Sequence, residues 1–244
     1  MPLFRKDVEE PPPEDPRDPP GWIRREIAIN VDPVNLPGDL VVPEHASALV
    51  VFAHGSGSSR RSPRNLAVAE VLHAAGLGTM LFDLLTPSES DDREKVFDIA
   101  LLANRLEAAA RWVWRWPALG DTPVAFFGAS TGAAAALVAA ADLGIRVASV
   151  VSRGGRPDLA GDALERVTAP TLLIVGSQDH DVLALNRGAE ARLRCERRFE
   201  VVPGAGHLFE EPGALERVAE LAAEWFAGHV EGARGGRTRL TDVF

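Results

Sequence analysis

Short apolar runs alternate with helical patterns along most of the chain, and this alternation limits the possible fold more than any other feature. The run Ala48–His54 (ALVVFAH) ends at Gly55 and is typical of a strand buried on both faces. Further strands are expected over residues 79–82, 124–127, 146–151, 171–175 and 198–202. Short strand–helix connections imply a largely parallel sheet with helices on both faces. In such sheets, functional residues gather at the carboxyl ends of the strands.

Helices are expected between these strands. Ser62 and Pro63 provide an N-cap and a first helical residue, and Gly76 closes that helix. A long helix is expected from Asp91 to Trp116, where apolar residues recur at three- and four-residue steps until Pro117. Other helices are expected over residues 131–143, 182–193 and 212–226, and an antiparallel strand pair over 26–31 and 40–42. The predicted class is therefore α/β, with a mostly parallel, doubly wound sheet of about 7–8 strands.

The length of the chain suits one large α/β domain. Of its 244 residues, 46% are hydrophobic and 25% are charged, which is the ordinary balance of a globular protein. Residues 7–20 hold six prolines and six acidic residues, so a disordered lead-in is expected over residues 1–22. A single domain is expected over residues 23–230, followed by a flexible tail over residues 231–244.

The charge balance and the cysteine count argue against several kinds of partner. The chain has 26 basic and 35 acidic residues and a net charge of −9, whereas nucleic-acid binders are usually basic. Cys195 stands alone, so we expect no internal disulfide framework and no multi-cysteine metal site. The serine chemistry described below requires no metal and no cofactor. The N-terminus lacks the apolar core of a signal peptide, and no apolar stretch is long enough to cross a membrane. These features predict a cytoplasmic protein with a small-molecule substrate and leave the oligomeric state open.

The sequence Gly128-Ala129-Ser130-Thr131-Gly132 carries the clearest chemical signal. It follows an expected strand and directly precedes an alanine-rich helix. In this context a G-x-S-x-G pattern forms a tight turn that lifts a serine hydroxyl above the sheet as a nucleophile. Gly128 and Gly132 would remove side chains where the strand and helix backbones approach each other. The alternative interpretation is a structural turn with a polar tip.

A nucleophilic serine needs a base, and an acid that orients the base, in the chain order serine, acid, histidine. Asp179 and His207 each follow an expected strand, so we expect both on the same rim of the sheet as Ser130. Asp181 is the competing acid, and we favour Asp179 because it comes first after its strand. The histidines outside this set are interpreted as structural or solvated: His45, His73, His180 and His229.

A tetrahedral oxyanion would need two N–H donors. The residue after the nucleophile, Thr131, is expected to supply one, and Ser56 in the glycine-containing loop after His54 the other. An alternative interpretation of this loop is a dinucleotide-binding fingerprint, because Gly55 and Gly57 follow a strand. It is disfavoured, since the third glycine position holds Arg60 and the helix begins late.

Six segments together resemble an α/β-hydrolase of the dienelactone-hydrolase-like group, over roughly residues 24–228. They are HGSGSSRRSPRN, LFDLLTP, GASTG, SRGGRPDLAG, VGSQDHDV and PGAGHLFEEPG. The resemblance implies Ser130 as nucleophile, Asp179 as acid and His207 as base. The best-known dienelactone hydrolases have a cysteine nucleophile, and the serine here favours a general carboxylic ester as substrate. Cys195 lies in a charged stretch far from the elbow and is interpreted as structural.

The short connection over residues 152–170 leaves no room for a separate cap domain. An open pocket lined by loops is therefore expected, with four substrate-binding candidates: Leu85, Arg153, Val182 and Leu208. Arg153 or Arg156 either holds a substrate carboxylate or pairs with Asp158 or Asp162, and the salt bridge is the favoured interpretation. The arginines of residues 60–64 are expected to be a solvated helix start.

The predicted function is that of a serine carboxylesterase that cleaves small or short-chain acyl esters through an acyl-enzyme. Two alternatives within enzymes are a lactone or dienelactone hydrolase and an acyltransferase. An alternative of another class is a non-catalytic protein that binds a small ligand on the same fold.

Overall fold

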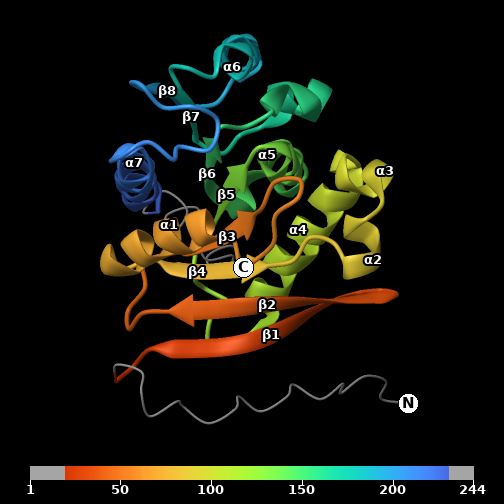
Figure 1. The fold of residues 1–244 in the computed structure, drawn as a ribbon. Coiled ribbons are helices and arrows are strands. Elements are labelled where there is room, and N and C mark those ends of the chain that lie inside the picture. The colour runs from red at the N-terminus through yellow and green to blue at the C-terminus, as the bar shows by residue number, and fades with distance from the viewer. Residues whose placement is uncertain (1–19, 231–244) are drawn as a thin grey trace, which may run out of the picture.

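The computed structural model describes residues 20–230, and an eight-stranded sheet forms its centre (Figure 1). The strand order is β1-β2-β4-β3-β5-β6-β7-β8. The strands are β1 (Ile23–Val31), β2 (Val34–Val42), β3 (Leu49–Ala53), β4 (Gly78–Phe82), β5 (Val124–Ala129), β6 (Val147–Arg153), β7 (Thr171–Gly176) and β8 (Arg197–Val202). Strands β3 to β8 run parallel, whereas β1 and β2 form the expected antiparallel edge. The predicted fold class is confirmed.

The expected terminal segments fall mostly outside the described range. Of the lead-in expected over residues 1–22, only Pro20–Trp22 are described, and the expected tail over residues 231–244 lies entirely outside. Within residues 20–230, no helix is both long and apolar enough to cross a membrane.

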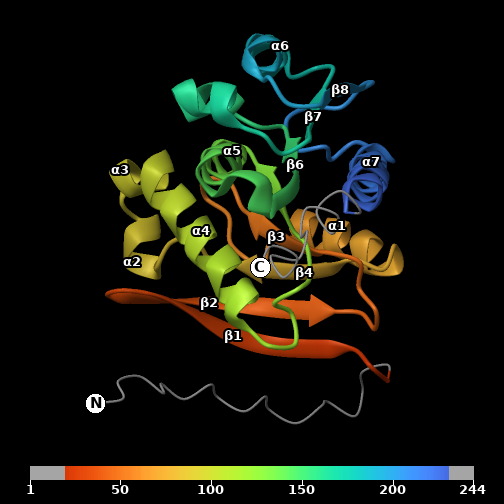
Figure 2. The same ribbon diagram turned by 180° about the vertical axis from the view of Figure 1, so that it is seen from behind.

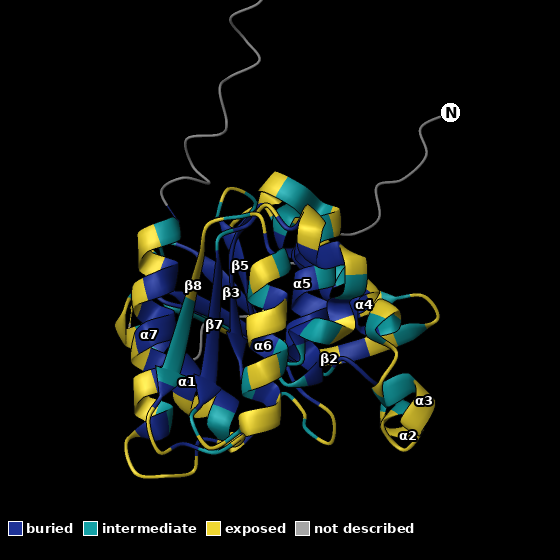
Figure 3. Cartoon of the chain, turned by 90° about the horizontal axis from the view of Figure 1, so that it is seen from above, coloured by how far each residue is buried: buried dark blue, intermediate teal, exposed yellow. Residues whose placement is uncertain are grey.

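Helices cover both faces of the sheet (Figures 1 and 2). They are α1 (Pro63–Ala74), α2 (Pro87–Ser90), α3 (Arg93–Val96), α4 (Ile99–Arg115), α5 (Thr131–Leu143), α6 (His180–Arg192) and α7 (Ala214–His229), with 3₁₀ helices η1 (Gly144–Arg146) and η2 (Pro157–Arg166). Helices α4, α5 and α6 contribute to one buried apolar cluster, and α1 and α7 to the cluster on the opposite face. Figure 3 shows the strands buried between helices whose outer surfaces are exposed.

The prediction of one long helix from Asp91 to Trp116 is wrong for the first part of this range. The chain instead forms α2 and α3 and begins α4 only at Ile99. The side chain of Asp92 accepts a hydrogen bond from the N–H of Glu94, and that of Asp98 accepts one from Leu101. These aspartates cap two new helix starts, because a short acidic side chain competes with helix continuation for backbone N–H groups.

The connection between β6 and β7 contains only η2, and Gly161 interrupts it at a φ of 54°. The expectation that no separate cap domain covers the sheet is therefore confirmed. Loops therefore surround the carboxyl ends of β3 and β5. These two strands are neighbours in the sheet, because the chain passes from β3 to β4 on one side of β3 and then returns to β5 on the other side of β3. Such a change of direction is where doubly wound sheets bind ligands.

A buried ion pair fixes α2 against α4. Glu89 accepts hydrogen bonds from both Nη1 and Nη2 of Arg105, each at 2.8 Å, and Arg105 Nη1 also donates to the Leu84 carbonyl oxygen at 2.6 Å. The two side chains are only 12% and 4% exposed. Hydrogen bonds from Arg105 lower the pKa of Glu89 from its ordinary 4.5 to about 2. The pair therefore holds the segment that carries Leu85 and Ser90.

Glu89→Gln is expected to lower the free energy of unfolding at pH 7 by about 3 kcal/mol, because it leaves Arg105 buried without its counter-charge. A carboxylate whose pKa is lowered by folding stabilises the fold fully when the pH is above the pKa that it has in the unfolded chain. The difference between variant and wild type should therefore shrink as the pH falls from about 4.5 toward 2. Urea unfolding at a series of pH values measures this difference in the free energy of unfolding. Glu220→Gln, which breaks the exposed pair with Arg217, is the matched control and should change stability little.

Candidate active site

Ser130 occupies a strained turn between β5 and α5. Its φ of 50° and ψ of −121° are unusual for a residue with a side chain. Strain of this kind is typical of a nucleophile elbow, where it holds a serine hydroxyl above the carboxyl end of the sheet. The expected strand–turn–helix geometry is therefore present.

The glycines on either side of Ser130 are required by close backbone contacts. A Cβ atom at Gly128 would lie 2.5 Å from the Ala133 Cα, and one at Gly132 would lie 2.1 Å from the Ala53 carbonyl oxygen. Both distances are far inside van der Waals contact. The pattern thus lets α5 begin directly against β3 and β5, as expected from the sequence.

His207 and Asp179 form a hydrogen-bonded pair above the same edge of the sheet. The distance from His207 Nδ1 to Asp179 Oδ2 is 2.6 Å, and the Asp179 side chain is only 14% exposed. Asp181 is exposed in the first turn of α6 and makes no such contact with His207. Of the two acids considered from the sequence, Asp179 is thus the one that can orient the imidazole.

Backbone contacts keep the two loops together. Gln178 donates its N–H to the Ala205 carbonyl oxygen at 2.9 Å, and Gly204 donates its N–H to Ser177 Oγ at 2.8 Å. The loop that carries Asp179 and the loop that carries His207 are therefore fixed relative to each other before any substrate binds.

The segment after β6 connects Ser130 to His207. The Ser130 N–H donates to the Arg153 carbonyl oxygen at 3.3 Å, and a Cβ atom at Gly154 would lie 3.7 Å from His207 Cε1. Within residues 20–230, no hydrogen bond joins the His207 ring to Ser130 Oγ. Such contacts are often long in the absence of substrate and tighten when it binds.

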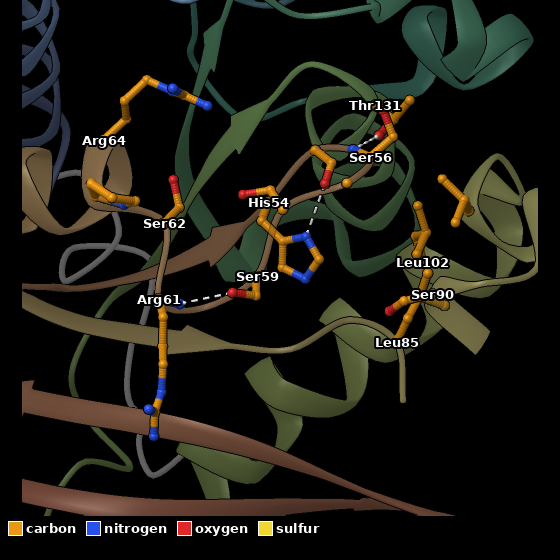
Figure 4. A pocket seen from close by; sticks show the side chains of 15 residues that line it. His54, Ser56, Ser59, Arg61, Ser62, Arg64, Leu85, Ser90, Leu102 and Thr131 are labelled. Atoms are coloured by element: carbon orange, nitrogen blue, oxygen red, sulfur yellow. Dashed lines mark hydrogen bonds between the residues drawn. The ribbon is translucent and has the colours of Figure 1, made fainter. Parts of the chain in front are cut away.

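The two expected oxyanion donors are brought together, and one of them already has a partner. The Ser56 N–H donates to Thr131 Oγ1 at 3.0 Å (Figure 4). Thr131 is the first residue of α5, where a backbone N–H has no carbonyl partner within the helix. Ser56 can therefore bind an oxyanion only when the Thr131 hydroxyl releases or shares its N–H.

Sequence reasoning gave no role to His54, which supports this loop. Its ring is buried, with Nδ1 3.0 Å from the Gly55 carbonyl oxygen, and its Nε2 accepts the Leu84 N–H at 3.0 Å. This network assigns the proton to Nδ1, and burial lowers the pKa of the ring. A neutral His54 thus ties the loop after β3 to the loop after β4. The available sequence signal was its position at the end of a buried strand.

A cavity of about 500 Å³ lies beside the elbow (Figure 4). Thr131 and Ser56 line it together with Leu85, and its wall includes Arg61 and Arg64. Of the four expected substrate-binding residues, only Leu85 lines this cavity. The other three lie elsewhere: Arg153 and Val182 are buried, and Leu208 is exposed.

The arginines considered from the sequence follow their expected arrangement only in part. Arg156 forms the favoured salt bridge, with Nε and Nη2 donating to Asp158 at 2.9 and 2.8 Å. Arg60 is not simply solvated, because it pairs with Asp83 and with Asp39. The sequence could not give the partners of Arg60, because Asp39 belongs to β2 and Asp83 follows β4.

Cys195 packs partly buried against the core, where its Sγ donates to Thr171 Oγ1 at 3.7 Å. Burial raises the pKa of the thiol, which opposes formation of a reactive thiolate. Within residues 20–230, no group of three or more His, Cys, Asp or Glu side chains is arranged to hold a metal.

Cys195→Ser is expected to leave any turnover of p-nitrophenyl acetate within about twofold of wild type, because a partly buried thiol with a raised pKa is a poor nucleophile. Steady-state rates with p-nitrophenyl acetate measure this. Iodoacetamide treatment of the wild type provides the complementary test. Activity lost in proportion to alkylated Cys195 would contradict the structural interpretation of this residue.

A mostly parallel eight-stranded sheet with a strained serine elbow and a histidine–aspartate pair at its carboxyl edge defines the α/β-hydrolase class. A dienelactone hydrolase from Anabaena variabilis is 52% identical to this chain, with a TM-score of 0.83, over 86% of this chain and 99% of that structure. The chain therefore belongs to the dienelactone hydrolase family. An α/β serine hydrolase homologue from Coxiella burnetii has the same fold, with 22% identity and a TM-score of 0.69, over 82% of this chain and 96% of that one. No protein-family model matches the sequence.

Two proteins of Mycobacterium tuberculosis, provisionally named phosphoribosyl transferases, are 58% identical to this chain over 207 residues. The match includes 85% of this chain but only 47% of theirs. The chain thus spans about half the length of these curated relatives.

Proposed function

We propose that this protein is a serine hydrolase that cleaves carboxylic esters with small or short acyl groups through an acyl-enzyme. The observation that carries the proposal is the strained Ser130 at the carboxyl end of β5, on the same rim as a His207 ring held by Asp179 at 2.6 Å. A serine is a poor nucleophile without a base, and this pair can provide one.

In the proposed mechanism, His207 accepts the Ser130 hydroxyl proton through Nε2 while Ser130 Oγ attacks the ester carbonyl carbon. Asp179 accepts the Nδ1 hydrogen bond and stabilises the imidazolium that forms. The N–H groups of Thr131 and Ser56 stabilise the tetrahedral oxyanion. The imidazolium then protonates the departing alcohol, and water, activated by the same histidine, releases the acid and restores Ser130.

The proposed preference for small acyl groups is supported by the shape of the site. The cavity beside the elbow holds about 500 Å³, and no separate cap domain extends it. Lactone hydrolysis and acyl transfer use the same acyl chemistry as ester hydrolysis. In a lactone the alcohol remains part of the acyl group, and in acyl transfer an acceptor other than water attacks the acyl-enzyme. Phosphoribosyl transfer rests only on the name of relatives about twice as long, and no arrangement among residues 20–230 favours it.

The test combines kinetics with labelling of the nucleophile. With p-nitrophenyl acetate we expect a burst of p-nitrophenol followed by a slower steady rate, because an acyl-enzyme accumulates. A p-nitrophenyl phosphonate should add one phosphonyl group to the peptide that contains Ser130. Absence of turnover and of this adduct would favour a non-catalytic ligand-binding protein, and an adduct on another residue would reject Ser130 as the nucleophile.

A further inference from the structure

The loop over residues 153–156, which begins with the last residue of β6, holds the backbone of Ser130 from both sides. The Arg153 carbonyl oxygen accepts the Ser130 N–H at 3.3 Å, and the Arg156 N–H donates to the Ser130 carbonyl oxygen at 3.0 Å. Ser130 has a φ of 50°, and a strained backbone of this kind persists only where its surroundings hold it in place. The 153–156 loop therefore sets the position of the serine.

The same loop contacts the segments that carry the acid and the histidine. The Gly154 N–H donates to the Ile174 carbonyl oxygen at 2.8 Å on β7, the strand that leads to Asp179. The loop also packs against the histidine loop, since a Cβ atom at Gly154 would lie 3.1 Å from the His207 carbonyl oxygen. The segments of all three members of the proposed triad thus meet at one loop.

The side chain of Asn186 anchors this loop. Its Nδ2 donates to the Gly155 carbonyl oxygen at 2.9 Å and to the Val182 carbonyl oxygen at 2.8 Å, and the residue is fully buried. Among residues 20–230, no other group donates to the Gly155 carbonyl oxygen. Gly155 itself packs against the start of α5, because a Cβ atom there would lie 2.5 Å from the Ala133 Cβ. The Asn186 amide therefore holds the middle of the loop where it contacts the helix after the elbow.

The other hydrogen bond of Asn186 ends in the first turn of α6, next to the acid. Asp179 precedes this helix as its N-cap residue, and its carbonyl oxygen accepts the Leu183 N–H at 2.8 Å. Val182 lies in the same turn. One buried amide thus joins the helical turn that continues from Asp179 to the loop that holds Ser130.

An amide at position 186 is less favourable for packing than an apolar side chain would be. Its Oδ1 is buried, and no donor in the described part of the chain reaches it. Exchanging the amide nitrogen and oxygen would place Oδ1 against two carbonyl oxygens, so the hydrogen-bond network fixes the orientation. A leucine has nearly the same shape and leaves no buried polar atom of its own. The hydrogen bond to the Gly155 carbonyl oxygen is what asparagine provides here and leucine does not.

We propose that Asn186 is a positioning residue that keeps Ser130 within reach of the His207 base. It touches neither the substrate nor the reacting atoms, and it acts through the Gly155 carbonyl oxygen. This inference rests on the proposed esterase function, since it assigns a residue to the same reaction. A displacement of about 1 Å in a reacting geometry lowers the rate about 100-fold, so a hydrogen bond that fixes the loop affects turnover.

Asn186→Leu removes this donor and nearly preserves the volume of the side chain. We expect kcat and kcat/KM for p-nitrophenyl acetate to fall by the same factor, about 10- to 100-fold, because acylation and deacylation both use the serine–histidine geometry. The pH midpoint of kcat/KM should equal that of the wild type, because the hydrogen bond between Asp179 and His207 is left intact. Asn186→Ala, which removes the same donor without adding atoms, should show the same pattern.

Thr171→Val is the matched control. Thr171 is also fully buried, and its Oγ1 donates to the Ala169 carbonyl oxygen at 3.0 Å, at the amino end of β7. Each variant removes a buried hydrogen bond from a side chain to a loop carbonyl, so both should lower the unfolding temperature to a similar degree. Thr171→Val should nevertheless keep turnover within about twofold of wild type. Wild-type turnover in folded Asn186→Leu and Asn186→Ala, an equal loss in Thr171→Val, or a lowered pH midpoint would overturn the proposal.

Amide hydrogen exchange separates a failure of this proposal from a failure of the esterase proposal. Absence of turnover and of the Ser130 phosphonyl adduct in the wild type would reject the esterase function, and exchange at the Ser130 and Arg156 amides, followed by NMR, then decides. In Asn186→Leu both amides should exchange at least about tenfold faster than in the wild type, because their hydrogen bonds open more often, and in Thr171→Val they should not change. Wild-type exchange at both amides in Asn186→Leu would overturn the proposal whether or not the protein is active.

Discussion

Ser130→Ala and His207→Ala are each expected to lower kcat for p-nitrophenyl acetate by about 10⁴- to 10⁶-fold, and the double variant should lose little more. The two side chains act as one unit, because an unactivated hydroxyl cannot attack and a base without its nucleophile has nothing to deprotonate. Both side chains lie at the surface of the carboxyl edge of the sheet, so their truncation should leave the fold intact. Circular dichroism and unfolding temperature check this point.

Two exposed residues outside the proposed triad serve as controls. His180→Ala removes the histidine next to Asp179, and Ser88→Ala removes a surface serine of α2. Both should retain nearly full turnover. If purified and folded Ser130→Ala and His207→Ala variants also retained it, the acyl-enzyme mechanism would be rejected.

Asp179→Asn is expected to lower kcat about 10⁴-fold while the fold is preserved. An asparagine amide in this position donates to His207 Nδ1 and thereby stabilises the tautomer whose Nε2 carries the proton. That tautomer cannot accept a proton from Ser130. Steady-state turnover of p-nitrophenyl acetate measures the loss.

Asp181→Asn is the matched control for this substitution, because it makes the same change two residues away on the exposed start of α6. It should alter kcat by no more than about threefold, since surface substitutions away from a site have small effects. The reverse result, a large loss in Asp181→Asn alone, would show that Asp181 orients the histidine in solution.

The parts of the fold that follow from local sequence were predictable. Apolar runs indicate buried strands by themselves, and the elbow needs only Gly128, Ser130 and Gly132 in a strand–helix context. The break before α4 was missed because the apolar periodicity continues across Asp92 and Asp98. Only the capping geometry of these two aspartates ends one helix and begins the next.

The surroundings of the candidate site depend on contacts between distant segments. Sequence spacing could not decide whether Arg153 or Arg156 would pair with Asp158, because Arg153 ends β6 whereas Arg156 lies in the loop beyond it, and the folded backbone sets the direction of each side chain. It also gave no indication that His54 would bind the loop after β4. These contacts arise only when the sheet has assembled.

The hydrogen bond from the Ser56 N–H to Thr131 Oγ1 has a consequence for selectivity along the reaction coordinate. A neutral ester carbonyl that binds to this N–H replaces one neutral acceptor by another and gains little. The oxygen that becomes negative during attack forms a bond about twice as strong, so it displaces the threonine hydroxyl with a net gain. A neutral substrate carbonyl therefore does not displace the Thr131 hydroxyl from the Ser56 N–H, whereas the oxyanion does. Stabilisation is then concentrated at the point where the charge develops, which is the condition for faster turnover rather than tighter substrate binding.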